Sequence, residues 1–118
     1  MNEVIVIKAY DPRWPDAFRA EQHSLHRVLN TFSPQIVHIG STAVPGLPAK
    51  PIIDIMIGLP SQQTLNKSIE ALEQAGYQYC PEYESVIPER RFFCGALFHG
   101  RHVHVHAIEV GSEFWQRR

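Results

Sequence analysis

Between positions 14 and 32 the apolar residues recur at steps of three and four. They are Ala17, Phe18, Leu25, Val28, Leu29 and Phe32. This period is typical of an amphipathic helix that buries one stripe of its surface, so a helix is predicted from Trp14 to about Asn30. Asp11 precedes two prolines that a helix tolerates only in its first turn, and it is the expected N-cap.

The other apolar residues are grouped in short runs rich in Val, Ile and aromatic side chains, which favour strands. The predicted strands span 3–8, 36–39, 52–57, 92–98 and 102–110, and 77–80 is a candidate edge strand. Residues 99–101 join the last two strands as a link of hairpin length. A second helix is predicted from its N-cap Ser61 to about Ala75, with Gly76 as its stop. The sum is an α+β fold, a mixed sheet of about five strands with helices packed against it.

Composition narrows the classes of function. Eleven Lys and Arg against twelve Asp and Glu give a formal net charge of -1 over 118 residues, without a long run of either sign. This balance gives no support to bulk nucleic-acid binding or to binding of a membrane surface. Cys80 and Cys94 stand alone, outside any CxxC spacing, which favours buried or half-buried thiols over a disulfide or a zinc site.

The two ends of the chain bear on its location and completeness. The N-terminus does not have the pattern of a signal peptide, and no apolar run approaches the roughly 20 residues of a membrane span. We therefore expect a single cytoplasmic domain over residues 1–118. A helix start at Ser112 carries an aromatic pair, yet the chain stops at Arg118. This pattern indicates either a chain truncated at its C-terminus or a tail completed by another subunit, as in a homo-oligomer.

Candidate chemistry is concentrated between the strands predicted at 36–39 and 52–57. Gly40, Ser41 and Thr42 form a turn whose backbone N–H groups and hydroxyls suit a phosphate, because glycine permits close approach. Asp54 lies on an otherwise apolar strand, where its carboxylate is suited to hold a Mg²⁺ ion that bridges phosphate oxygens. Lys50, in the connecting loop, is placed to neutralise phosphate charge. The same pattern also describes a plain structural turn with Asp54 paired to Lys50 or to an arginine.

Several blocks of this sequence resemble the GrpB family, whose members are nucleotidyltransferase-like and uncharacterised. The blocks are GSTAVPGLPAKPIID at 40–54, YDPRWPDAF at 10–18, HVHV at 102–105 and EVGSEFW at 109–115. The resemblance implies the nucleotidyltransferase fold, in which a Gly-Ser turn precedes a strand with two alternating carboxylates that bind divalent metal. It also implies a further helical segment beyond the end of this chain. A nucleotide or another phosphorylated small molecule is the ligand predicted from the turn and Asp54.

This sequence departs from that signature at one position. The two alternating positions are Asp54 and Met56, and a methionine thioether is a poor ligand for Mg²⁺. A standard two-metal site is therefore not expected, and a single Mg²⁺ or Mn²⁺ ion at Asp54 is the cofactor hypothesis. The observation also favours an alternative, a domain that keeps the fold, has lost catalysis and acts with a partner enzyme.

Two further groups of side chains are candidates for the site. His102, His104 and His106 alternate with small apolar residues and therefore share one face of a strand. The three imidazoles together are candidate ligands of a transition metal, with His104 as the metal ligand of the leading hypothesis. Alternatively His104, the central one, is a general base or phosphate ligand, whereas the plain alternative is a strand with one face in water. Arg91 is the candidate phosphate-binding arginine, among several arginines near the ends of the same predicted hairpin.

The leading hypothesis joins these residues into one nucleotide site. Asp54 is its metal anchor and, with His104, its catalytic pair. The phosphate contacts come from Gly40, Ser41, Thr42, Lys50 and Arg91. The identity of the base and of the substrate stays open, as does a metal-dependent hydrolase that uses the histidine strand.

Overall fold

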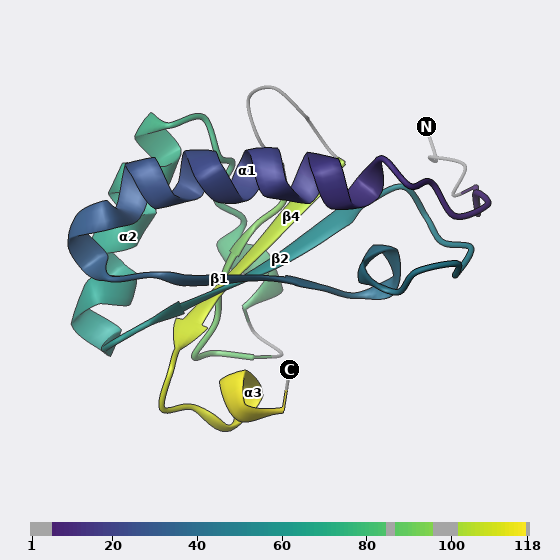
Figure 1. Ribbon diagram of the computed structural model, residues 1–118. Helices are drawn as coiled ribbons and strands as arrows, with labels where there is room; N and C mark the ends of the chain where they lie inside the picture. Colours follow the sequence, from purple (N-terminus) through teal and green to yellow (C-terminus); the bar gives the residue numbers. More distant parts are fainter. Residues whose placement is uncertain (1–5, 85–86, 96–101, 118) are drawn as a thin grey trace.

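A computed structural model of the chain describes residues 6–84, 87–95 and 102–117. Its helices are α1 (Trp14–Leu29), α2 (Gln62–Gln74) and α3 (Glu113–Gln116), and its strands are β1 (Gln35–Ile39), β2 (Ile53–Leu59), β3 (Arg91–Phe93) and β4 (Val103–Glu109). Short 3₁₀ turns occur at Asn30–Phe32, Ser41–Ala43 and Pro81–Tyr83. The α+β class predicted from the sequence is confirmed (Figure 1).

The four strands of the described residues form one mixed sheet in the order β1-β2-β4-β3. β2 runs parallel to β4, while β1 is antiparallel to β2 and β3 is antiparallel to β4. The expectation of about five strands is not met in the described part. Residues 3–5 lie outside it, and Lys8 makes only an isolated bridge to Ala49. Tyr79 likewise makes a single bridge to Phe93 in place of an edge strand.

The predicted hairpin between 92–98 and 102–110 is confirmed in its pairing only. β3 and β4 are antiparallel neighbours, but β3 is limited to three residues. The link at 99–101 lies outside the described residues.

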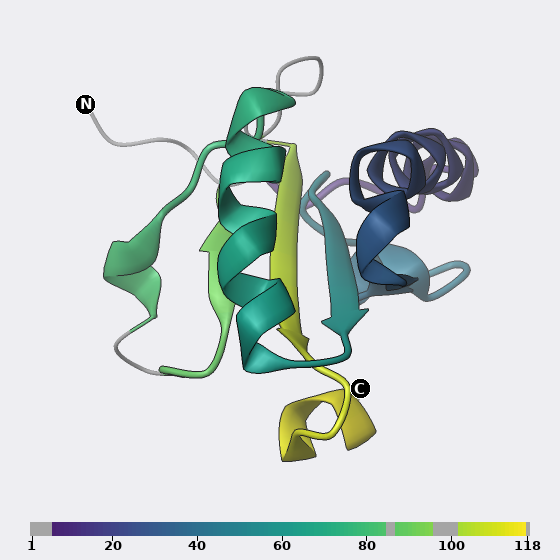
Figure 2. The ribbon, with the colours of Figure 1, turned by 90° about the vertical axis from the view of Figure 1, so that its left-hand side faces the viewer.

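Helices α1 and α2 cover one face of the sheet, and their apolar stripes form the core with it. The fully buried side chains of this core are Leu25, Leu29, Leu65, Leu72, Ile55, Ile57, Leu59, Phe93, Val105 and Ala107. Figure 2 shows α3 beyond the arrowheads of β2 and β4, away from both long helices. There Trp115 packs on Gly58, where an added Cβ would lie 2.7 Å from the indole ring. In the described part of the chain, much of the second face of the sheet carries no helix. We call this the open face, and it is where the polar side chains gather.

The ends of the helices follow local rules with one exception. Ser61 caps α2 by accepting a hydrogen bond from the Thr64 amide, in the capping box that such a residue pair forms. The expected cap of α1 by Asp11 is wrong, because that carboxylate accepts from the amide and guanidinium of Arg13. In the described ranges, none of the helices combines the length and the apolar composition that crossing a bilayer needs.

The preference for free thiols at Cys80 and Cys94 is wrong, since the structure joins them in a disulfide. The bridge between Tyr79 and Phe93 continues as backbone hydrogen bonds on both sides and brings the two cysteine Cα atoms to 6.0 Å. That separation lies within the range that a disulfide spans. A pairing between strands is not visible in the spacing of two lone cysteines.

Candidate functional site

The polar side chains on the open face lie where β1 ends and where β2 and β4 begin. Asp54, the second residue of β2, is in register with Ile39 on one side and with His104 on the other. Residues that are paired in register project to the same face, so the carboxylate and the imidazole meet. The sheet pairing therefore brings Asp54 and His104 together, as the sequence predicted.

Two imidazoles approach the same oxygen of Asp54. His106 Nε2 lies 3.4 Å and His104 Nδ1 lies 3.6 Å from Asp54 Oδ1. His102 does not join them, because its Nδ1 lies 3.0 Å from the carbonyl oxygen of Pro51. The alternating histidines thus share a face as predicted, but two of the three reach the carboxylate.

The electrostatics around His104 keep its ring uncharged at neutral pH. Burial lowers its pKa from the ordinary value of 6.5, and the charge of Asp54 opposes this shift. His106 and Lys50 lower the pKa further, which places the exposed Lys50 ammonium within electrostatic reach of the site. A neutral imidazole is able to accept a proton or to bind a ligand through its free lone pair.

Gly40 is the point of closest approach between the turn and Asp54. Its φ is +76° and its ψ is -171°, a combination that is essentially reserved for glycine. A Cβ added at Gly40 would lie 2.8 Å from Asp54 Oδ2 and 3.2 Å from Asp54 Cβ. The turn therefore lies directly against the second carboxylate oxygen, and any side chain at position 40 would collide with it.

Ser41 and Thr42 occupy different environments in this turn. The Ser41 side chain is exposed, whereas Thr42 is buried. The Thr42 hydroxyl donates to the carbonyl oxygen of Ile52 at 2.9 Å and lies 3.0 Å from His38 Nε2. Since that ring stacks on Phe18 of α1, Thr42 ties the turn to the helix layer. Its hydroxyl is thus occupied, and the Ser41 hydroxyl is the one presented outward.

The structure does not bring Arg91 to this group. Arg91 pairs with Ala107, which faces α2, and its guanidinium donates to Asn66 Oδ1 on that helix at 3.1 Å. Its neighbour Arg90 instead reaches the open face, where Nη1 lies 3.1 Å from His106 Nδ1. β3 begins at Arg91, and the contacts of the two guanidinium groups place them on opposite faces of the sheet.

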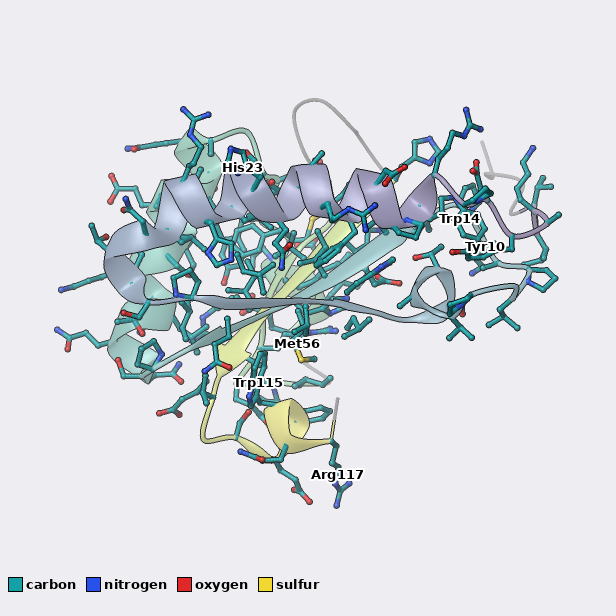
Figure 3. All side chains as sticks on the ribbon, viewed as in Figure 1. Tyr10, Trp14, His23, Met56, Trp115 and Arg117 are labelled. Atoms are coloured by element: carbon teal, nitrogen blue, oxygen red, sulfur yellow. A yellow bond between two sulfur atoms is a disulfide. The ribbon has the colours of Figure 1, made fainter. Side chains whose placement is uncertain are left out.

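Sequence reasoning placed His106 on the right face but considered it only as one of three imidazoles for a shared metal ion, and it considered Arg90 only as one of several arginines. The signal that identifies both is the register of β4 with β2 and β3, which pairs His106 with Met56 and with Phe92. In Figure 3, Met56 points away from α1 and toward the side of α3. It lies on the open face beside Asp54, as the alternation predicted.

Few side chains at this site are able to bind a metal ion. Among the described residues there is no group of three or more His, Cys, Asp or Glu side chains arranged to hold a metal ion. One carboxylate with phosphate oxygens and water is nevertheless a common way to bind Mg²⁺. The residues therefore fit a divalent cation only when another molecule supplies the other oxygens.

Comparison with known proteins places this geometry in context. A family model described as GrpB protein matches residues 4–118. A UPF0157 protein of Pseudomonas aeruginosa is 41% identical over 114 residues, which is 94% of this chain and 46% of that protein. The chain thus spans less than half the length of that curated relative.

Two solved structures have a similar fold over the part that this chain matches. The GrpB protein of Enterococcus faecalis has a TM-score of 0.80 and 28% sequence identity, covering 94% of this chain and 66% of that one. The poly(U) polymerase Cid1, solved with MgGTP bound, has a TM-score of 0.57 at 16% identity, over 86% of this chain and 34% of that one. The second likeness concerns the fold alone.

Proposed function

The chain belongs to the GrpB family and shares the fold of Cid1, and from this premise we propose that it binds a nucleotide or another phosphorylated small molecule at Asp54. The observation that carries the proposal is the convergence of one turn and two imidazoles of β4 on one carboxylate. The Gly40 turn lies against Oδ2, and the imidazoles of His104 and His106 lie against Oδ1. An aspartate that is 28% exposed and so surrounded is placed to meet a cation or a proton donor of a ligand.

Each residue has a distinct part in the proposed site. The turn of Gly40 and Ser41 receives a phosphate through backbone N–H groups and the exposed hydroxyl. Lys50 adds positive charge from the loop. His104, neutral at pH 7, accepts a proton or a hydrogen bond from the ligand. The Thr42 hydroxyl donates to the carbonyl oxygen of Ile52, so in the proposed site it stabilises the turn and does not bind the phosphate.

One divalent cation, Mg²⁺ or Mn²⁺, completes the proposed site. When bound, it neutralises charge on the phosphate oxygens. Asp54 is the residue that holds it, and the ligand's phosphates supply the oxygens that the described residues lack. We therefore expect tight cation binding only in the presence of the nucleotide.

A nucleotidyl transfer at this site balances with a nucleoside triphosphate and an acceptor hydroxyl as its two reactants. An acceptor oxygen bonds to the α-phosphorus, the bond from that phosphorus to the pyrophosphate oxygen breaks, and the acceptor proton passes to His104. Pyrophosphate leaves with the electron pair of the broken bond. The residues contribute positioning and charge neutralisation, which are the main requirements of this chemistry.

Calorimetric titration with ATP, CTP, GTP and UTP, in Mg²⁺ and in Mn²⁺, tests the binding proposal. We expect at least one nucleotide to bind, and Asp54→Asn to weaken it by about tenfold or more. Asp16→Asn is the matched control, because Asp16 is an exposed aspartate of α1 whose carboxylate pairs with Arg19 on the same helix. Absence of binding by all four nucleotides, or equal affinity of the parent and Asp54→Asn, would refute the proposal.

Met56 supports a second candidate function. It lies on the face of Asp54 at the position where a second carboxylate would complete a metal pair. The candidate is a domain that binds the same ligand, has no catalytic activity and acts with a partner enzyme. Nucleotide binding without turnover in any acceptor assay, together with co-purification of one enzyme in stoichiometric amount, would favour it over a transferase.

A further inference from the structure

We propose that Arg90 is a positioning residue that acts through His106 on Asp54. Its guanidinium fixes which ring nitrogen of His106 carries the proton, and that proton then fixes the orientation of the Asp54 carboxylate. The inference rests on the proposed function only in taking Asp54 as the anchor of the site. Its central step is a hydrogen-bond direction that is measurable without any ligand.

The direction follows from the donor inventory of the two side chains. Arg90 Nη1 lies 3.1 Å from His106 Nδ1, and a guanidinium has N–H donors only. Nδ1 must therefore accept this hydrogen bond with its lone pair, so the ring proton is on Nε2. His106 Nε2 lies 3.4 Å from Asp54 Oδ1 and donates to it. The sequence of contacts runs from a permanent cation, through one imidazole, to the carboxylate.

Arg90 is held firmly enough to impose this direction. Nη2 donates to the carbonyl oxygen of Tyr83 at 2.9 Å, and the guanidinium lies 4.9 Å from the centre of the Phe92 ring. Cations over aromatic rings at this range are attracted to the face of the ring. Nε is buried and has no hydrogen-bond partner among the described residues, so the position of Arg90 is determined by its other contacts.

Phe92 also contacts the two histidines that approach Asp54. Its ring centre lies 5.1 Å from that of His106 and 5.4 Å from that of His104. The buried ring is thus a common platform for three side chains of the site. This arrangement explains why β3, only three residues long, matters to a site on β2 and β4.

The consequence for Asp54 is an asymmetric carboxylate. Oδ1 receives the His106 hydrogen bond, which leaves Oδ2 facing the Gly40 turn, where a phosphate and its cation would be bound. Partners that orient a ligating group in this way commonly change metal affinity by about 10- to 100-fold when they are removed.

Long-range ¹H–¹⁵N correlation of the histidine rings in the ligand-free chain at pH 7 tests the inference. His106 is assigned by the loss of its signals in His106→Gln. We expect the parent to show a protonated Nε2 and an unprotonated Nδ1. Asp54→Ala should keep this state because Arg90 sets it, whereas the double variant Arg90→Met with Asp54→Ala, which has neither partner of the ring, should lose it. A proton on Nδ1 in the parent, loss of the state in Asp54→Ala, or an unchanged ring in the double variant would each overturn the inference.

Arg91→Met is the matched control, since it removes an equal charge one residue away on the other face of the sheet. It should leave the His106 ring signals as they are in the parent. Binding of ATP with Mn²⁺ gives the functional readout, in which Arg90→Met should bind about tenfold more weakly than the parent while Arg91→Met does not. If the parent binds no nucleotide, the proposed function fails while the ring measurement still decides the role of Arg90.

Discussion

Substituting Gly40 by alanine is the most direct way to test the geometry around Asp54. The backbone at Gly40 has φ +76° and ψ -171°, and holding a residue other than glycine in this region costs about 1–3 kcal/mol. The new Cβ would also lie 2.8 Å from Asp54 Oδ2, closer than atoms can remain. We expect Gly40→Ala to lower the free energy of unfolding by at least the backbone cost and to displace the carboxylate.

Gly46→Ala separates the two effects. Gly46 also has a positive φ, +82°, but an added Cβ there has no atom within 4 Å. Both variants therefore carry backbone strain, and Gly40→Ala alone disturbs Asp54. Urea unfolding gives the stability of each variant, and calorimetry with ATP and Mn²⁺ gives the affinity. We expect Gly46→Ala to bind like the parent and Gly40→Ala to lose binding. Equal stability and equal affinity of the two variants would refute the close approach of the turn to the carboxylate.

Three further predictions concern the stability of the fold. Cys80→Ser should lower the free energy of unfolding by about 3 kcal/mol, which is the loop-closure value for a disulfide spanning roughly 15 residues. If the variant stays less stable than the parent by this amount in dithiothreitol, the disulfide is not the origin of the effect. Tyr77→Phe should lower it by about 1.5–3 kcal/mol, because the Tyr77 hydroxyl donates to the buried carboxylate of Glu21. Burial raises the pKa of Tyr77 above its ordinary 10.0, so on raising the pH the unfolded chain loses the phenolic proton before the folded chain does. The stability of the parent should therefore fall above about pH 10, and that of Tyr77→Phe should fall less. Burial lowers the pKa of His38 and of His104 below 6.5, so the unfolded chain binds protons first as the pH falls. Urea unfolding at pH 7.5 and 5.5 should therefore show lower stability at the lower pH, and His38→Gln should reduce the difference between the two pH values. The same difference in His38→Gln and in the parent would count against a contribution of His38.

Local patterns were sufficient to predict the helices and the turn. The three- and four-residue period gave α1, Ser61 gave the start of α2, and the glycine at position 40 marked the point where the backbone meets Asp54. Each of these signals depends on residues close together in the chain, which is where periodicity and capping rules apply. The GrpB-like blocks, together with these signals, were enough to single out Asp54 as a candidate site residue.

Pairing between distant strands was the information that the sequence lacked. The choice between Arg90 and Arg91 depends on which of two successive residues pairs with Ala107, because a shift of one residue exchanges the two faces. The disulfide between Cys80 and Cys94 depends on the same kind of pairing. Neither feature has a local signal, and so both were missed or misassigned.

The two oxygens of Asp54 have different partners, and Met56 adds a second difference between the two sides of the proposed site. Its register partner is His106, so an apolar side chain borders the imidazole that holds Asp54. A carboxylate at position 56 would compete for the Nε2 proton of His106 and would add a second negative charge beside Asp54. With methionine there, the His106 proton has one acceptor, and Arg90 can impose a single orientation on the carboxylate. In the proposed site, the methionine at position 56 and the contact between Arg90 and His106 are therefore two parts of one arrangement, in which a single aspartate would be held for a cation that arrives with its ligand.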